Sequence, residues 1–176
     1  MRVLGIDPGL TRCGIAVVDV HSGRRVSLVH AGVVRTSKEA DLGVRLQQLE
    51  LGILEVVTGF EPTAIAVEQV FSQHNVRTVI GTAQAAGIAS LVAARQGIPM
   101  AFHTPSEVKA AVTGSGRADK QQVALMVGRI VGKPLTVAAY LTVAVALAIC
   151  HGWRFPAQQR LERALAIGGE KARASR

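Results

Sequence analysis

Short apolar runs separated by turn residues open the chain and predict strands. The runs cover residues 3–6, 14–20 and 25–34. The first ends at Asp7-Pro8-Gly9, and the turn His21-Ser22-Gly23 separates the second from the third. Because these connections are short, neighbouring runs are expected to pair antiparallel, and the pattern predicts a meander.

The hydrophobic period changes from that of strands to that of helices after residue 41. Apolar residues then recur every three or four positions, at Leu42, Leu46, Leu49, Ile53, Val56 and Phe60. Short apolar runs at 64–67 and 98–102 predict further strands, the first of them bounded by Pro62 and Glu68. Additional helices are predicted at 76–96, 105–112, 120–131 and 138–153.

A meander followed by strand–helix–strand crossovers predicts an α/β protein, a mixed five-stranded sheet flanked by helices with a ribonuclease H-like fold. We assign residues 1–153 to this one domain, since 176 residues suffice for a single sizeable core. Residues 154–176 carry six basic and two acidic residues. Such a segment is typical of a solvated basic tail, with or without contact to nucleic acid.

The whole chain is basic, with 20 Lys and Arg against 12 Asp and Glu and a formal net charge of +8. This excess favours a polyanionic partner, most commonly nucleic acid, and a basic protein without such a partner is the alternative. Cys13 and Cys150 show no zinc or disulfide spacing, so we expect reduced, buried thiols. Without a signal peptide or a span-length apolar stretch, a soluble cytoplasmic protein is expected.

Two carboxylates, Asp7 and Glu68, each follow a short apolar run. If both runs form neighbouring parallel strands, both side chains lie at the same edge of the sheet, where α/β proteins build their sites. Oxygen ligands of this kind suit Mg²⁺ or Mn²⁺. For either residue alone, a satisfied acid at the end of a strand is the simpler interpretation.

A glycine-rich turn, Gly114-Ser115-Gly116, precedes the predicted helix at 120–131. Backbone N–H groups at the start of that helix, with Lys109, Arg117 and Lys120 around them, could hold a DNA phosphate. A flexible turn with solvated lysines is the alternative. Phe71 follows Glu68 closely and could stack on a base or cap the core.

The predicted helix at 76–96 is rich in Gly and Ala. Small residues along one face allow a close helix approach, which fits either ordinary core packing or a dimer interface. The histidines show no metal-ligand spacing.

Taken in order, the motifs resemble those of the RuvC-type Holliday junction resolvases from Met1 to about Trp153. They are Gly5-Ile6-Asp7-Pro8-Gly9 with Gly14, Ala66-Val67-Glu68-Gln69-Val70-Phe71, Thr82-Ala83-Gln84-Ala85-Ala86-Gly87, Pro105-Ser106-Glu107-Val108-Lys109 and Gly114-Ser115-Gly116-Arg117-Ala118-Asp119-Lys120-Gln121-Gln122-Val123. No single motif is decisive, and their common order makes the resemblance specific.

The resemblance implies a homodimer that nicks four-way junction DNA symmetrically, with two Mg²⁺ ions per site and Mn²⁺ as an alternative. It also implies a junction-binding and branch-migrating complex of the RuvA and RuvB type as partner. Asp7 and Glu68 match the first two catalytic acids of the family. Lys109 and Lys120 match basic residues near the scissile phosphate, and Phe71 matches an aromatic at the junction core.

The chain departs from the family pattern at two positions. The last helix of the family carries two aspartates three residues apart, and those positions hold Tyr140 and Val143 here. No Asp or Glu occurs between Asp119 and Glu162. Since carboxylates hold both metal ions in such enzymes, we predict strongly reduced or absent cleavage with retained junction binding.

Three interpretations follow from these patterns. The chain is a junction-resolving endonuclease, a junction-binding homologue with impaired catalysis, or an unrelated ribonuclease H-like protein. The later motifs and the lack of a nucleotide-binding loop weigh against the third. An altered reading of the gene over residues 135–143 would also explain Tyr140 and Val143, and the sequence does not separate it from loss of function.

Overall fold

The computed structural model describes residues 1–69, 76–133 and 140–155. Its centre is a five-stranded sheet in the order β3-β2-β1-β4-β5. The strands β1 (Arg2–Asp7), β2 (Arg12–Val20) and β3 (Val26–Arg35) form the predicted antiparallel meander, with a short 3-10 helix (Ser22–Arg24) in the second turn. The strands β4 (Ala64–Glu68) and β5 (Met100–His103) add to β1 in parallel.

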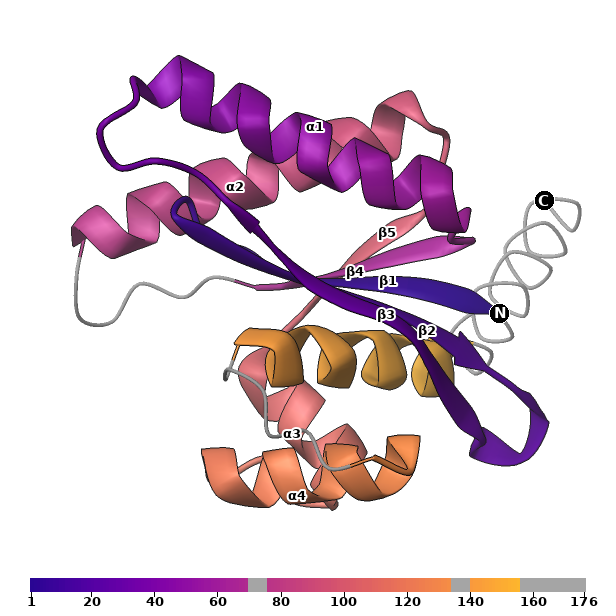
Figure 1. The fold of residues 1–176 in the computed structure, drawn as a ribbon. Coiled ribbons are helices and arrows are strands. Elements are labelled where there is room, and N and C mark those ends of the chain that lie inside the picture. Colours follow the sequence, from indigo (N-terminus) through magenta and orange to yellow (C-terminus); the bar gives the residue numbers. More distant parts are fainter. Residues whose placement is uncertain (70–75, 134–139, 156–176) are drawn as a thin grey trace, which may run out of the picture.

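Helices cover both faces of this sheet (Figure 1). On one face lie α1 (Leu42–Phe60) and α2 (Val76–Arg95). On the other lie α3 (Pro105–Thr113), α4 (Lys120–Val131) and a helix over residues 140–155, which is unlabelled and orange in Figure 1. The chain is therefore a three-layer α/β structure.

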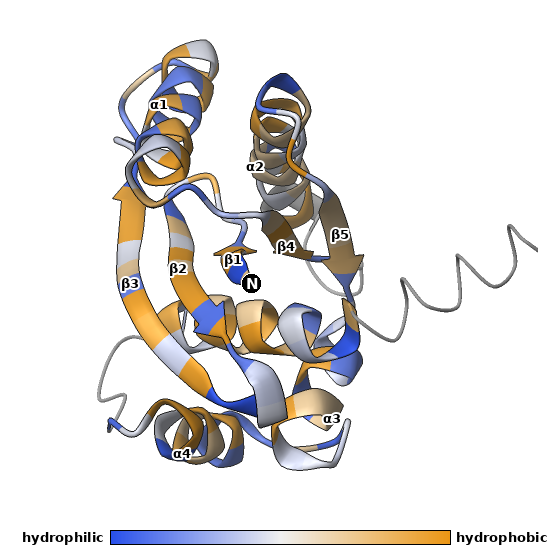
Figure 2. Cartoon of the chain, turned by 90° about the vertical axis from the view of Figure 1, so that its right-hand side faces the viewer, coloured by the Kyte–Doolittle hydropathy of each residue, from blue (hydrophilic) through white to orange (hydrophobic). Residues whose placement is uncertain are grey.

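Successive side chains of β1 and β2 point to opposite faces of the sheet, so the core consists of two clusters, one on each face. Leu4, Ile6 and Val17 pack with α1 and α2. Val3 and Val18 pack with the helices of the opposite face. Because successive strand residues point to opposite sides, a strand buried on both faces reads as the continuous apolar run seen in the sequence. The hydropathy colouring in Figure 2 shows these orange strands between the two helical layers.

The sequence-based elements agree with the structure to within a few residues, and the predicted α/β class with a mixed sheet is confirmed. Asp7 and Glu68 are the last residues of their strands rather than the first residues after them. The buried alanines of α2 lie in the core beside α1, so core packing accounts for this face of the helix. They are Ala85, Ala86, Ala89 and Ala93.

Some predictions fall outside the described residues. Phe71 is one of the residues that the structure does not describe. Residues 156–176, which make up most of the predicted basic tail, are also outside the described ranges. The helix over 140–155 reaches the last described residue. Both cysteines are free and buried, as expected. In the described ranges, no helix is long and apolar enough to cross a membrane.

Candidate active site

The two carboxylates predicted from the sequence lie together at one edge of the sheet. Ile6 and Val67 are register partners in the parallel pair β1–β4, and Asp7 and Glu68 follow them directly. Neighbouring strands lie about 4.8 Å apart, so the two side chains project from adjacent positions. The sequence therefore predicted their juxtaposition correctly.

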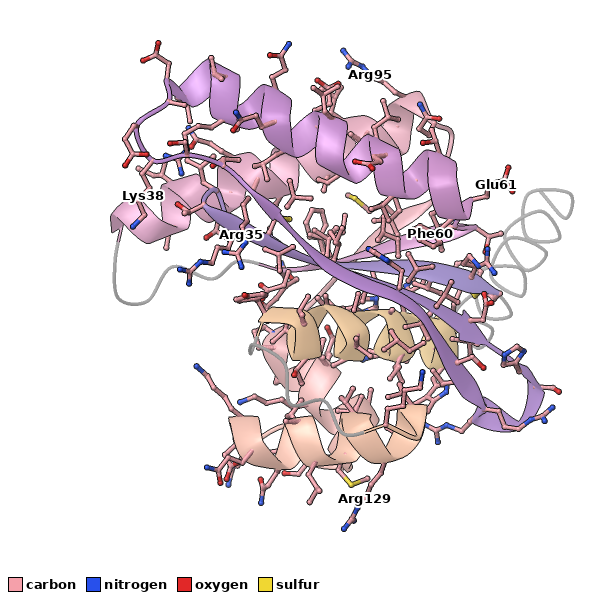
Figure 3. All side chains as sticks on the ribbon, in the orientation of Figure 1. Arg35, Lys38, Phe60, Glu61, Arg95 and Arg129 are labelled. Atoms are coloured by element: carbon pink, nitrogen blue, oxygen red, sulfur yellow. The ribbon has the colours of Figure 1, made fainter. Side chains whose placement is uncertain are left out.

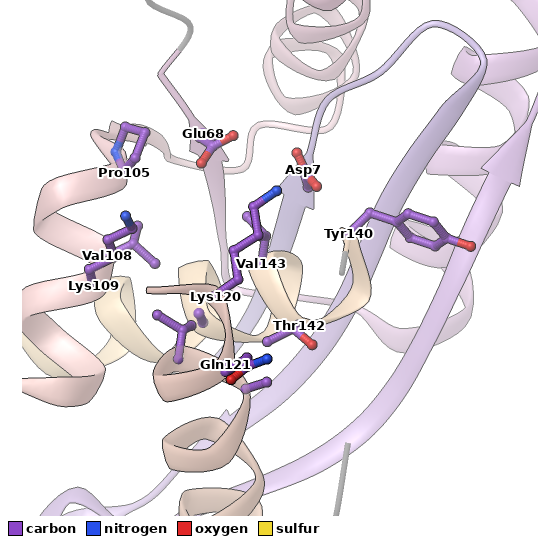
Figure 4. Close-up of a pocket in the computed structure, with 13 residues that line it drawn as sticks. Asp7, Glu68, Pro105, Val108, Lys109, Lys120, Gln121, Tyr140, Thr142 and Val143 are labelled. Carbon is purple, nitrogen blue, oxygen red and sulfur yellow. The ribbon is translucent and has the colours of Figure 1, made fainter. Parts of the chain in front are cut away.

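These carboxylates open into a cavity of about 690 Å³ beneath the sheet edge (Figure 4). Its walls come from β1, β4, α3, α4 and the helix over 140–155. The lining residues are Asp7, Glu68, Pro105, Val108, Lys109, Lys120, Gln121, Val123, Ala124, Tyr140, Thr142, Val143 and Ala146. Six of the eight predicted site positions line one cavity, while Phe71 is outside the described residues and Arg117 is exposed and not part of the lining.

Burial makes both carboxyl groups reluctant to ionise. It raises the pKa of Asp7 to about 7, and the neighbouring Glu68 charge adds to that rise. Burial also raises the pKa of Glu68, while the Lys109 charge acts against the rise. A divalent cation bound between the two carboxyl groups would favour their charged form, and the displaced proton would pass to solvent.

Helix caps place the two lysines at the cavity. In α3 the Thr104 hydroxyl accepts a hydrogen bond from the backbone of Glu107, and Lys109 follows one half-turn later. In α4 Asp119 caps the helix and Lys120 is its first residue. The Lys120 side chain points toward Asp7 in Figure 4. Both ammonium groups therefore lie where they can neutralise a phosphate beside the carboxylates.

The predicted phosphate site at the start of α4 needs correction. The Asp119 carboxylate accepts a hydrogen bond from the Gln122 backbone, and the Gln122 side chain accepts one from the Asp119 backbone. A carboxylate already occupies the positive end of this helix, and it would repel a second anion. The cationic contribution of this segment comes from the side chain of Lys120 instead.

Two glycines of the sheet fix where the helix over 140–155 lies. A Cβ atom at Gly5 would come within 2.0 Å of the Ala144 carbonyl oxygen, and one at Gly14 within 2.5 Å of the Tyr140 carbonyl oxygen. Gly14 is the register partner of Asp7. The helix over 140–155 therefore packs against the sheet directly beside Asp7, so the turn at residues 140–144 forms a wall of the site.

That wall carries no carboxylate. Tyr140, Thr142, Val143 and Ala146 line the cavity, and the Tyr140 ring points away from Asp7 and Glu68 in Figure 4. No group of three or more His, Cys, Asp or Glu side chains that could hold a metal ion exists among the described residues. Two carboxylates fit one hard cation that keeps several water ligands, and they do not fit a pair of ions.

A buried histidine pair beside the site was not predicted. His103, opposite Glu68 in the β4–β5 register, has its Nε2 atom 3.0 Å from Nδ1 of His151. The side chains are 4% and 3% exposed. Burial lowers the pKa of both, that of His151 to about 4. Their separation of 48 positions in the sequence leaves no local signal for the pair, except that each histidine ends an apolar run.

Proteins of one known family are similar to this chain. The family model described as Crossover junction endodeoxyribonuclease RuvC matches residues 3–151. The crossover junction endodeoxyribonuclease RuvC of Streptomyces avermitilis is 57% identical over 178 residues, which cover 98% of this chain and 99% of that protein. That of Streptomyces griseus is 59% identical over 171 residues, covering 94% and 82%.

The chain belongs to the RuvC family. Its structure agrees: Thermus thermophilus RuvC, solved in complex with a Holliday junction substrate, superposes with a TM-score of 0.82 at 36% identity, covering 86% of this chain and 92% of that one. The family resemblance and the ribonuclease H-like fold predicted from the sequence are thereby confirmed. The part of this chain that matches the family model, residues 3–151, includes every site position that the structure describes.

Proposed function

We propose that this RuvC-family protein is a Holliday junction resolvase of DNA recombination and repair, a metal-dependent endonuclease that nicks four-way junctions. The observation that carries this proposal is the convergence of Asp7 and Glu68 with Lys109 and Lys120 on one cavity of a RuvC fold. The lysine side chains can hold the negative charge of a phosphodiester, and the buried carboxylates lie beside the bond that would be cleaved. We expect it to act in the cytoplasm.

Asp7 and Glu68 are the residues that would hold a divalent cation, Mg²⁺ or Mn²⁺. A bound cation supplies positive charge at the scissile phosphate and lowers the pKa of bound water. The chain itself contributes the orientation of the phosphate. Lys109 and Lys120 neutralise its charge from α3 and α4, and the apolar residues Val108 and Val123 keep water from the lower wall of the cavity.

A second candidate function is a junction-binding homologue that cleaves slowly or not at all. It is favoured by one observation, the placement of Tyr140 and Val143 in the cavity wall beside the carboxylates. The two-ion site expected of the family needs more oxygen ligands than Asp7 and Glu68 provide. Binding does not depend on those ligands, since phosphate contacts supply most of the affinity for nucleic acid.

We also propose that the protein is a homodimer and works with a junction-binding and branch-migrating complex of the RuvA and RuvB type. An exposed stripe on α2 supports the dimer. It joins Ile80, Gly87 and Leu91 at helical spacing, with Ile80 52% and Leu91 39% exposed. This stripe lies on the side of α2 opposite the alanines that fill the core, and symmetric nicking of two strands requires two such sites.

The test is a gel shift and a cleavage assay on one synthetic four-way junction, each with Mg²⁺ and with Mn²⁺. The expected result is a shift of the junction in preference to linear duplex, with symmetric nicks that disappear in an Asp7→Asn variant. A shift without nicks would favour the junction-binding homologue. Equal affinity for duplex and junction would contradict both candidates.

A further inference from the structure

A second cavity lies at the same edge of the sheet, on the other side of the turn that follows Asp7. It has a volume of about 510 Å³ and opens between the β1–β2 turn, the segment that leads into α1, and α2. Its lining residues are Gly9, Leu10, Thr11, Arg12, Lys38, Arg45, Gly81 and Thr82. Figure 3 shows Lys38 at this edge, with Arg35 beside the same end of the sheet.

One cation of this cavity is held in place by the fold. The Arg45 guanidinium donates from Nε to the Thr36 hydroxyl over 3.0 Å and from Nη2 to the Thr11 hydroxyl over 2.9 Å. The Thr36 hydroxyl in turn donates to the Leu10 carbonyl, and Thr36 is 6% exposed. These bonds use two of the five N–H donors of the arginine, so an oriented, charged group faces the cavity with donors to spare.

The other two cations are exposed. Arg12 begins β2 and Lys38 lies between β3 and α1. Neither they nor Arg45 form an ion pair within the part of the chain that the structure describes. Glu39 is the nearby acid, but it accepts a hydrogen bond from Ser37 and does not line the cavity. Three positive charges from three segments thus surround a hollow whose lining contains no carboxylate.

We propose that this cavity binds a backbone phosphate of the junction, on a strand that continues from the one held at Asp7. The inference rests on the proposed function and adds a contact outside the catalytic cavity. Gly9 of this cavity is two residues from Asp7, so their Cα atoms are at most about 7.6 Å apart. A single DNA backbone can therefore reach both cavities, and a preorganised arginine with two mobile cations suits a phosphodiester.

The experiment compares junction binding by the unsubstituted chain and by an Arg12→Ala, Lys38→Ala double variant at several salt concentrations. Both residues are exposed, so folding should be preserved. Loss of one phosphate contact should weaken binding about tenfold at low salt and reduce the slope of log affinity against log salt by about one. The matched control is Arg129→Ala, an exposed arginine that Figure 3 places at the far side of α4.

A charge-retaining variant, Arg12→Lys with Lys38→Arg, should bind with the affinity and the salt slope of the unsubstituted chain. If the double alanine variant keeps both quantities, the phosphate site is wrong while junction binding stands. If Arg129→Ala lowers the slope as much as the double variant, the effect is general charge and the site is again wrong. An unsubstituted chain that fails to bind the junction would overturn this inference together with the proposed function.

Discussion

The Tyr140 backbone rests on Gly14, and this contact decides which side chains can reach the catalytic cavity. A Cβ atom at residue 14 would lie 2.5 Å from the Tyr140 carbonyl oxygen, which no relaxed structure permits. Because Gly14 is paired with Asp7 across β1 and β2, the contact anchors the helix over 140–155 beside the Asp7 carboxylate. The helix position, more than the identity of its residues, makes this turn part of the site.

Replacing Gly14 with Ala should therefore destabilise the protein and disturb the cavity together. The added methyl group must displace the helix at Tyr140, and overpacking of this kind costs about 1–3 kcal/mol. Urea unfolding followed by circular dichroism measures the loss. The matched control is Gly59→Ala in α1, where a Cβ would meet nothing within 4 Å. That variant should be about 0.5–1 kcal/mol more stable. Equal stabilities for both variants would contradict the packing argument.

Asp7 should lower the stability of the protein at neutral pH. Its pKa is raised to about 7 in the fold from 3.8, so the folded state holds a proton that the unfolded state releases. Stability is then lost as pH rises from 3.8 through about 7. Asp7→Asn should raise the free energy of unfolding at pH 8 by about 2 kcal/mol, because burying a neutral amide costs less than burying a charge. Asp41→Asn, an exposed carboxylate without a side-chain cap bond, should change little.

Mn²⁺ should offset the loss of stability that the charged Asp7 carboxylate causes in the unsubstituted chain. A cation that binds the folded protein alone stabilises it by mass action, by about 2.7 kcal/mol at one hundred times its dissociation constant. Thermal unfolding with increasing Mn²⁺ should show a rising melting temperature at pH 8. The Asp7→Asn variant should show none of this rise. The same rise in both proteins would place the cation elsewhere.

The buried histidine pair should make the protein sensitive to acid. The pKa of His151 falls from 6.5 to about 4 on folding, so the unfolded state binds more protons between these values. Stability is complete above about pH 6.5 and is lost as pH falls toward about 4. The shift corresponds to roughly 3 kcal/mol. It is measured by urea unfolding at pH 7.5 and pH 4.5, with every variant compared in the Asp7→Asn background, because Asp7 titrates over the same range with the opposite effect on stability.

His151→Leu tests the assignment, because it removes the titrating ring and fills its buried space. The difference in stability between the two pH values should then shrink by more than half. His21→Gln, at an exposed histidine in the β2–β3 turn, serves as the control and should keep the full difference. An unchanged difference in the His151→Leu variant would assign the acid sensitivity to other groups.

Much of this architecture follows from local patterns. Apolar runs that end in Asp7 and Glu68 predicted two parallel strands with carboxylates at one edge, since strand burial and turn chemistry are both readable along the chain. The His103–His151 pair and the Arg45–Thr36–Leu10 linkage were not predictable. They join residues far apart in sequence, and only the packing of helices on the sheet brings them together. The capping role of Asp119 follows from the spacing of Asp119 and Gln122, which is that of a capping box, so local sequence indicates a helix end already occupied by a carboxylate.

The most direct test of this site is to place carboxylates at positions 140 and 143 and measure junction cleavage. The cavity of Asp7 and Glu68 should gain ligands from Tyr140→Asp and Val143→Asp, since both positions line it. We predict that the double variant cleaves a synthetic four-way junction at least about tenfold faster than the unsubstituted chain in Mg²⁺, because added carboxylates hold the ions that stabilise the transition state. Junction affinity should stay the same. Unchanged cleavage with unchanged binding would contradict the claim that this cavity is a nuclease site short of two acids.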